Sequence, residues 1–170
     1  GHSVGAGAAL LMASRTPSVA GVVSLAAFAH PATMMRRWLR SMHIPHFPLG
    51  AYILWYVQRT IGRRFDDIAP GHTIGLIHCP VLLVHGTDDQ VVPADDARAI
   101  HAHRRDDRTR LLLLPCGHDD SGELDGAMGE IVDFLNQALA PVSLYPDVVP
   151  ATGHPDVPAL PEREFTPNEQ

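Results

Sequence analysis

The sequence contains no lysine, so all thirteen basic residues are arginine. Arginine codons are GC-rich, and we attribute this bias first to the composition of the genome. Acidic residues are absent from the first part of the chain: residues 1–65 hold seven arginines and no acid, whereas residues 66–170 hold six arginines and all nineteen acids, for a formal net charge of −6. A nucleic-acid-binding protein needs a broad basic face, and this acidic total argues against a nucleic-acid partner.

Long apolar runs and cysteine clusters are missing as well. The longest apolar stretch, residues 47–57, is shorter than the roughly 18 residues that a membrane span needs, and it contains Pro48 and Gly50. Cys79 and Cys116, the only two cysteines, have no metal-binding or redox spacing, and the eleven histidines form no HExxH motif or Cys/His cluster. We therefore expect no membrane span, no metal and no cofactor.

Apolar segments alternate with helical patterns along the chain. Such alternation implies crossover connections and a parallel, doubly wound sheet of the α/β class. Residues 140–170 contain seven of the fifteen prolines and little apolar periodicity, which predicts a disordered tail. The expected elements are a small-residue helix at 4–14, a buried strand at 19–28, a helical insertion at about 30–70, a strand at 79–86, a helix at 94–104, a strand at 109–116 and an amphipathic helix at 123–139, whose buried face is expected to consist of Ile131, Phe134, Leu135 and Leu139.

The two cysteines are expected at opposite ends of this sheet. Cys79 opens one strand and Cys116 closes the next, so at about 3.3 Å per residue they lie roughly 20 Å apart. A disulfide requires a Cα separation below about 7 Å and is therefore excluded. Thiols of this kind fit a reducing compartment, and a cytoplasmic location is favoured.

The first five residues, GHSVG, match the pattern G-x-S-x-G. This pattern is typical of a sharp strand-to-helix turn that raises a serine hydroxyl above a sheet. It makes Ser3 a candidate nucleophile, and it assigns to Gly1 and Gly5 the role of leaving room where a Cβ would collide with the backbone. The alternative is that Ser3 only caps the following helix, a common role for serine at such a junction.

Further polar groups follow the next two strands. The stretch HGTDDQVVP at 85–93 follows one strand, and His118 follows the other. An acid and a histidine at the carboxyl ends of parallel strands face the ligand crevice of such a sheet. Serine, then aspartate, then histidine in this chain order is the order of a catalytic triad on one particular fold. The alternative for His118 is an ordinary loop histidine.

With these motifs the chain resembles the C-terminal half of an α/β-hydrolase, from the nucleophile elbow onward, over about residues 1–139. The resemblance identifies the expected strands with strands 6, 7 and 8 of that fold and the insertion at about 30–70 with its substrate cap. The acid of the family's HGxxDxxVP pattern falls on Asp89, with Asp88 as the rival. The resemblance also implies that strands 1–5 belong to a preceding part of a longer protein, so the chain is expected to be a fragment.

The resemblance assigns a role to each candidate residue. Ser3 attacks a carbonyl carbon, His118 accepts the serine proton, and Asp89 orients the imidazole. The backbone N–H of Val4 would be one oxyanion donor. The second donor would come from the preceding part of the fold, so the fragment alone is expected to be nearly inactive.

The expected activity is that of a serine hydrolase acting on an ester, thioester or related acyl bond of a small molecule, with carboxylic esters the first candidate. An acyltransferase, a peptidase and a non-catalytic binding domain of the same fold stay open, as does the oligomeric state. Arginines of the insertion could attract an anionic substrate or a membrane surface, although a solvated face is favoured. His2 and His85 are expected to be packing or hydrogen-bonding neighbours. The residues that could line an acyl pocket, or equally pack the insertion onto the core, include Trp38, Phe47 and Trp55.

Overall fold

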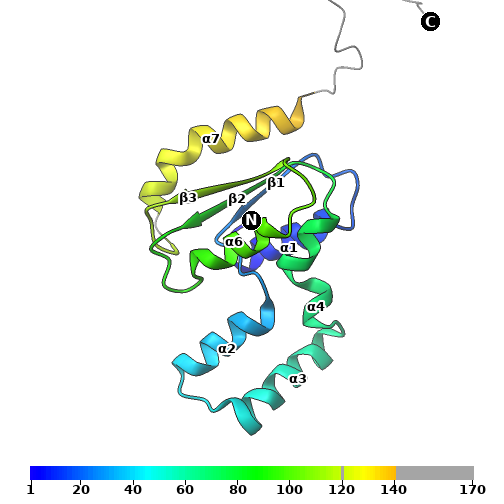
Figure 1. The fold of residues 1–170 in the computed structure, drawn as a ribbon, viewed down its shortest axis with the longest axis vertical. Coiled ribbons are helices and arrows are strands. Elements are labelled where there is room, and N and C mark those ends of the chain that lie inside the picture. Colours follow the sequence, from blue (N-terminus) through cyan, green and yellow to red (C-terminus); the bar gives the residue numbers. More distant parts are fainter. Residues whose placement is uncertain (120, 141–170) are drawn as a thin grey trace, which may run out of the picture. The chain divides into compact units, whose positions relative to one another are not determined.

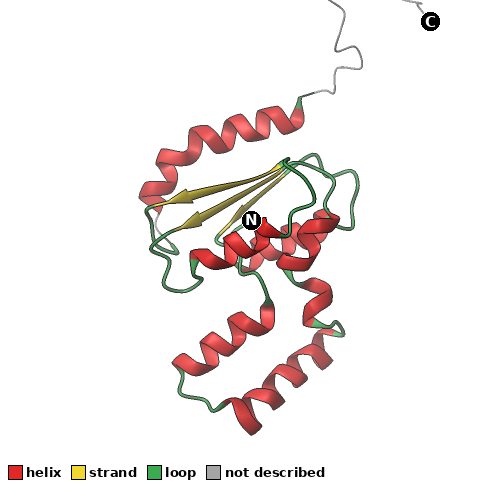
Figure 2. Cartoon of the chain, viewed as in Figure 1, coloured by secondary structure: helices red, strands yellow, loops and turns green. Residues whose placement is uncertain are grey.

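The computed structural model describes residues 1–119 and 121–140, and for residues 121–125 only the backbone (Figure 1). The predicted proline-rich tail lies, from residue 141 on, outside the described residues. Helices and strands alternate, with a helical segment inserted between the first two strands (Figure 2). In chain order the elements are α1 (Val4–Ala13), β1 (Val22–Leu25), α2 (Pro31–Ser41), η1 (His46–Gly50), α3 (Ala51–Ile61), α4 (Phe65–Ile68), α5 (Pro70–Thr73), η2 (Ile74–Leu76), β2 (Val81–Gly86), α6 (Ala94–Ala102), β3 (Thr109–Leu114) and α7 (Ser121–Leu139).

The described strands form one parallel sheet in the order β1-β2-β3. Val22 pairs with Val81, and Val81 pairs with Thr109, so the three strands begin at the same level. Their carboxyl ends therefore meet at one edge of the sheet. The loops that leave this edge after β2 and β3 carry the polar residues singled out above, and the predicted α/β class with a parallel sheet is confirmed.

Strand β2 is buried on both faces because it is the central strand. Successive side chains of a strand point to opposite faces, so an unbroken apolar run can fill both. Figure 1 shows α7 on one face of the sheet and α1 and α6 on the other. Val81 and Leu83 pack with Leu10 and Ile100 on the α1 and α6 side, whereas Leu82 and Val84 pack with Ile131 and Phe134 on the α7 side.

Strand β1 is shorter than the predicted span of 19–28. It ends at Leu25 because Ala26 adopts a left-handed backbone conformation, with φ of 52°. The Ala26 N–H still donates to the carbonyl of Val84, the partner of Leu25, at 2.9 Å. The apolar residues that follow are buried in the core without being part of a strand.

The buried face of α7 is narrower than the sequence predicts. Ile131 and Phe134 are buried, whereas Leu135 and Leu139 are exposed, at 37% and 68%. Ile131 and Phe134 pack with Leu82 and Val84 of the sheet, and neither leucine belongs to this group of packed side chains. Neither α7 nor another helix in the described part of the chain has the length and apolar character that crossing a bilayer demands.

The insertion between β1 and β2 is helical, as predicted. Its elements share a small core in which Ala32, Leu54 and Phe65 are buried. An ion pair attaches it to the main body: the two guanidinium nitrogens of Arg37 on α2 lie 2.8 and 2.7 Å from the two carboxylate oxygens of Asp96 on α6. Asp96 also accepts the N–H of Ala29, just before α2, at 3.2 Å.

Candidate active site

Ser3 occupies a sharp turn between an extended segment and α1. The extended segment pairs with β1: Leu25 N–H donates to the carbonyl of Gly1 at 2.9 Å, and Ser3 N–H donates to the carbonyl of Leu25 at 2.8 Å. Ser3 itself has φ of 51° and ψ of −116°, a conformation that is costly for a residue with a side chain. The hydrogen bonds with Leu25 before the turn and helix α1 after it hold Ser3 in this strained conformation.

The Ser3 hydroxyl does not cap α1: its side chain makes no capping hydrogen bond to the helix among the residues described. It lies instead 3.3 Å from Nε2 of His118. The capping alternative for Ser3 therefore does not describe this junction.

The two glycines of GHSVG differ in their surroundings. A Cβ on Gly1 would collide with the backbone of Gly5 and approach the amide nitrogen of Ala6 to 3.0 Å, which agrees with the predicted role of Gly1. A Cβ on Gly5 would meet no described atom within 4 Å. The steric role predicted for Gly5 is thus wrong within the described residues, because the position of its Cβ is open space there.

Asp89 lies in the loop that follows β2, and its side chain is fully buried. Its Oδ1 accepts the N–H groups of Val91 and Val92, each at 2.8 Å, and its Oδ2 lies 2.6 Å from Nδ1 of His118. Burial alone raises the pKa of Asp89, but the hydrogen bonds from His118, Val92 and Val91 outweigh it and hold the pKa below its ordinary value. Asp89 is therefore a carboxylate at neutral pH.

The neighbouring acid Asp88 is exposed and belongs to the turn, where its N–H donates to the carbonyl of Cys116. Of the two rivals, the structure brings Asp89 to His118. The fourth residue in this network is His85, which is buried and lies with Nε2 2.7 Å from the carbonyl of Val92 and 3.4 Å from Oδ2 of Asp89. His85 is a hydrogen-bonding neighbour, as predicted.

His118 follows β3 and joins the other two side chains. Because Oδ2 of Asp89 can only accept, Nδ1 of His118 carries the proton, which leaves the Nε2 lone pair facing the hydroxyl of Ser3. The side chains of Ser3, His118 and Asp89 thus form one continuous chain of hydrogen bonds at the carboxyl edge of the sheet. The loop-histidine alternative for His118 does not account for these two contacts.

Val4, the predicted oxyanion donor, is the first residue of α1. The first N–H groups of a helix have no carbonyl partner within it. Val4 directly follows Ser3 in the sequence, and its N–H makes no hydrogen bond of the helix. This N–H is therefore available to an oxyanion.

The predicted pocket residues Trp38, Phe47 and Trp55 do not line the cavity beside His118. Each is more than half exposed, at 54%, 82% and 57%. A cavity of about 280 Å³ lies beside His118, but it is lined by the ends of the strands and the loop after β3, with Leu25, Val84 and Leu114 among its apolar walls. A larger hollow of about 660 Å³ includes Trp55, but its other walls come from α3, α4 and the residues between them, and Ser3 is not part of its lining. The insertion buries Ala32, Leu54 and Phe65 and leaves these aromatic rings exposed. A role for them in substrate binding stays a prediction.

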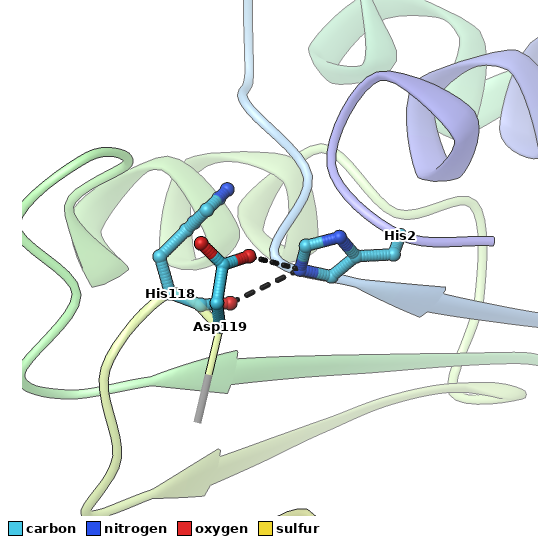
Figure 3. A group of neighbouring side chains, drawn as sticks. All are labelled: His2, His118 and Asp119. Atoms are coloured by element: carbon cyan, nitrogen blue, oxygen red, sulfur yellow. Dashed lines mark hydrogen bonds and ion pairs between the residues drawn. The ribbon is translucent and has the colours of Figure 1, made fainter. Parts of the chain in front are cut away.

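His2 and Asp119 lie beside His118 (Figure 3). Nε2 of His2 lies 3.0 Å from the carbonyl oxygen of His118 and 3.9 Å from Oδ1 of Asp119. The sequence identifies His2 as a hydrogen-bonding neighbour, but it contains no signal that joins His2 to Asp119, which lies more than a hundred positions away.

Comparisons with known proteins define the fold of the chain. No family model matches the chain. Solved structures that resemble it are enzymes of the α/β-hydrolase class, and the chain has the α/β-hydrolase fold, of which it contains a part. One is a 2,6-dihydroxy-pseudo-oxynicotine hydrolase, with a TM-score of 0.55 and 19% identity over 82% of this chain and 39% of that one. A Pyrococcus furiosus esterase has a TM-score of 0.60 and 14% identity over 81% and 51% of the two chains. A puromycin-hydrolyzing peptidase of Mycobacterium tuberculosis has a TM-score of 0.62 and 18% identity over 82% and 21%.

Among curated proteins, the chain is similar to two uncharacterized proteins from two strains of Mycobacterium tuberculosis. Each is 27% identical over 139 residues, which is 82% of this chain. The chain spans 43% of the length of these relatives.

Proposed function

We propose that this chain carries the catalytic residues of a serine hydrolase that cleaves an acyl bond, a carboxylic ester in the first instance. The observation that supports the proposal is the hydrogen-bonded series from Ser3 through His118 to Asp89. A helix cap needs no histidine at its serine, and a binding module needs no buried carboxylate behind that histidine. The strained backbone of Ser3 points in the same direction, because strain of this kind is typical of nucleophile turns.

The first half of the reaction forms an acyl-enzyme. The Ser3 oxygen attacks the substrate carbonyl carbon while Nε2 of His118 accepts the serine proton, giving a tetrahedral oxyanion and an imidazolium. The carboxylate of Asp89 holds the Nδ1 proton of His118 and stabilises the imidazolium. The N–H of Val4 donates to the oxyanion. His118 then returns its proton to the leaving oxygen as the carbon–oxygen bond breaks, and the acyl group stays on Ser3.

The second half returns the enzyme to its starting state. Water attacks the acyl carbon while His118 again accepts a proton, and the second tetrahedral intermediate collapses with transfer of this proton to Ser3. The carboxylic acid leaves. Apolar strand ends beside His118 suit the hydrocarbon part of such a substrate.

A fluorophosphonate probe on the full-length protein tests the proposal, because it labels only an activated serine. We expect labelling of the wild type, none of Ser3→Ala, and labelling of Asp89→Asn slowed by about 10³–10⁴-fold. Asp88→Asn is the matched control and should react within two-fold of the wild type. A folded full-length protein that is not labelled at Ser3 would instead favour a non-catalytic binding domain. Rates with p-nitrophenyl esters of increasing chain length then define the acyl group.

A further inference from the structure

Three potential metal ligands, His2, His118 and Asp119, line the cavity beside the strand ends. His2 lies in the extended segment before the turn, and His118 and Asp119 follow β3 (Figure 3). One ligand atom from each lies within 4.8 Å of the other two, and no second group of this kind occurs among the described residues. The sequence gives no metal-ligand spacing because the two histidines are 116 positions apart.

Two imidazole nitrogens and one carboxylate oxygen are a ligand set that suits Zn²⁺, with a fourth position open to water. Ligand atoms around tetrahedral zinc lie about 3.3 Å apart, given bonds of about 2.0 Å. Nε2 of His2 and Oδ1 of Asp119 are 3.9 Å apart. Both side chains are open to solvent, His2 by 44% and Asp119 by 84%, so they can close the remaining distance without disturbing the core.

His118 is already oriented for such a role. Its Nδ1–H points to the buried carboxylate of Asp89, which leaves the Nε2 lone pair as its available ligand atom. A carboxylate behind a histidine is the arrangement that fixes the tautomer of metal-bound histidines in general. The same Nε2 faces the Ser3 hydroxyl at 3.3 Å, so it cannot serve a metal and the serine at once.

We infer that His2, His118 and Asp119 form a binding site for a divalent zinc ion, and that zinc bound there withholds His118 from Ser3 and stops the hydrolase. The binding site does not depend on the proposed function; the inhibition does. His2 would bind through Nε2 as a neutral ring with its proton on Nδ1, releasing the carbonyl of His118 that it contacts now.

The inhibition is measured by the rate at which a fluorophosphonate labels Ser3 in the full-length protein at increasing Zn²⁺. We expect micromolar Zn²⁺ to slow labelling of the wild type at least ten-fold, and a chelator to restore it. Asp119→Asn and His2→Gln should each require at least ten times more Zn²⁺. Asp107→Asn, a control at another exposed acid outside the cluster, should keep the wild-type response. Equal zinc sensitivity of the wild type and both cluster variants would overturn the proposal.

Binding is measured separately with Co²⁺, whose visible absorption reports a four-coordinate site of nitrogen and oxygen ligands. The intense bands of such a site should form in the wild type and in Asp107→Asn and be lost in Asp119→Asn. If Ser3 is never labelled, the proposed hydrolase is wrong while these spectra still decide the metal site. Spectra that do not differ between the wild type and Asp119→Asn would overturn the site itself.

Discussion

Asp89 holds a negative charge inside the protein, and three hydrogen-bond donors balance it. Two come from the backbone of its own loop and one from His118, with His85 close by. An unpaired carboxylate at this depth would cost several kcal/mol. The hydrogen bonds that hold Asp89 in place for His118 therefore also stabilise the loop after β2.

A consequence at this scale is a specific dependence of stability on pH. The folded-state pKa of Asp89 is below its ordinary value of 3.8. A lowered pKa contributes stability that is fully present above the unfolded value and is lost as the pH falls through the folded value. We expect the free energy of unfolding of the wild type to fall steeply below about pH 4. That of Asp89→Asn should be lower than the wild-type value at neutral pH and should decrease less between neutral and acidic pH.

Urea unfolding at a series of pH values measures this difference. Asp88→Asn, which changes the exposed neighbour, should keep the slope of the wild type. Curves for Asp89→Asn and the wild type that run parallel down to pH 2 would contradict the assignment, because a constant offset cannot come from the titration of Asp89.

The sequence predicts individual residues well where each follows a local pattern. Ser3 follows a glycine motif, and Asp89 and His118 each follow an apolar strand, so the parallel sheet alone brings them to one edge. The sequence cannot predict the contact of His2 with Asp119. Nor can it predict the ion pair of Arg37 with Asp96, two residues that are 59 positions apart. Each of these contacts depends on how two separate segments pack against each other, and the periodicity of a segment carries no information about its packing partner.

At the scale of elements, Gly86 sets the distance between β2 and the loop that carries His118. A Cβ at Gly86 would collide with the carbonyl of Cys116 and lie 3.0 Å from the carbonyl oxygen of Gly117. Gly86→Ala must therefore push that loop outward. We expect a loss of about 1–3 kcal/mol in the free energy of unfolding and slower labelling of Ser3. Gly117→Ala is the control, since a Cβ there meets no described atom within 4 Å. Equal effects of the two substitutions in denaturation and labelling would refute this account.

An ion pair joins the inserted helix α2 to α6. The carboxylate of Asp96 is 7% exposed and accepts hydrogen bonds from Nη1 and Nη2 of Arg37. A double-mutant cycle of Arg37→Ala and Asp96→Ala should give a coupling energy of about 1.5–3 kcal/mol, as for hydrogen bonds to charged groups.

The matched control for this cycle is the exposed pair of Arg98 and Asp95, 3.5 Å apart on α6. Its coupling energy should be no more than about 0.5 kcal/mol. Loss of the Arg37–Asp96 pair should also make residues 30–70 more sensitive to a protease under native conditions. A coupling energy for Arg37 and Asp96 no larger than that of the control would show that the insertion is attached by its apolar contacts instead.

At the scale of the whole described fold, the two faces of the sheet are built unequally. The face under α1 and α6 is packed by a large group of buried side chains, whereas α7 covers the other with few. The sequence predicts the alternation of strands and helices, and hence the two covered faces, because that follows from periodicity. It does not predict which apolar residues of α7 reach the sheet, because helical spacing alone does not define the width of the strip beneath.

Phe134 should therefore be the residue on which the α7 face depends most. It is 2% exposed, packs with Ile131 over Leu82 and Val84, and carries the guanidinium of Arg110 at 5.1 Å from its ring centre. Truncation of a buried phenylalanine costs about 3–5 kcal/mol, and because few side chains surround this ring and fewer contacts are lost with it, we expect about 3 kcal/mol for Phe134→Ala. Leu139→Ala, on the same helix but 68% exposed, should change the free energy of unfolding by less than about 0.5 kcal/mol. Denaturant unfolding of both variants measures the two losses. Similar losses would mean that the predicted wide face of α7 is buried after all. A loss confined to Phe134→Ala means that this ring anchors the helix to its side of the sheet.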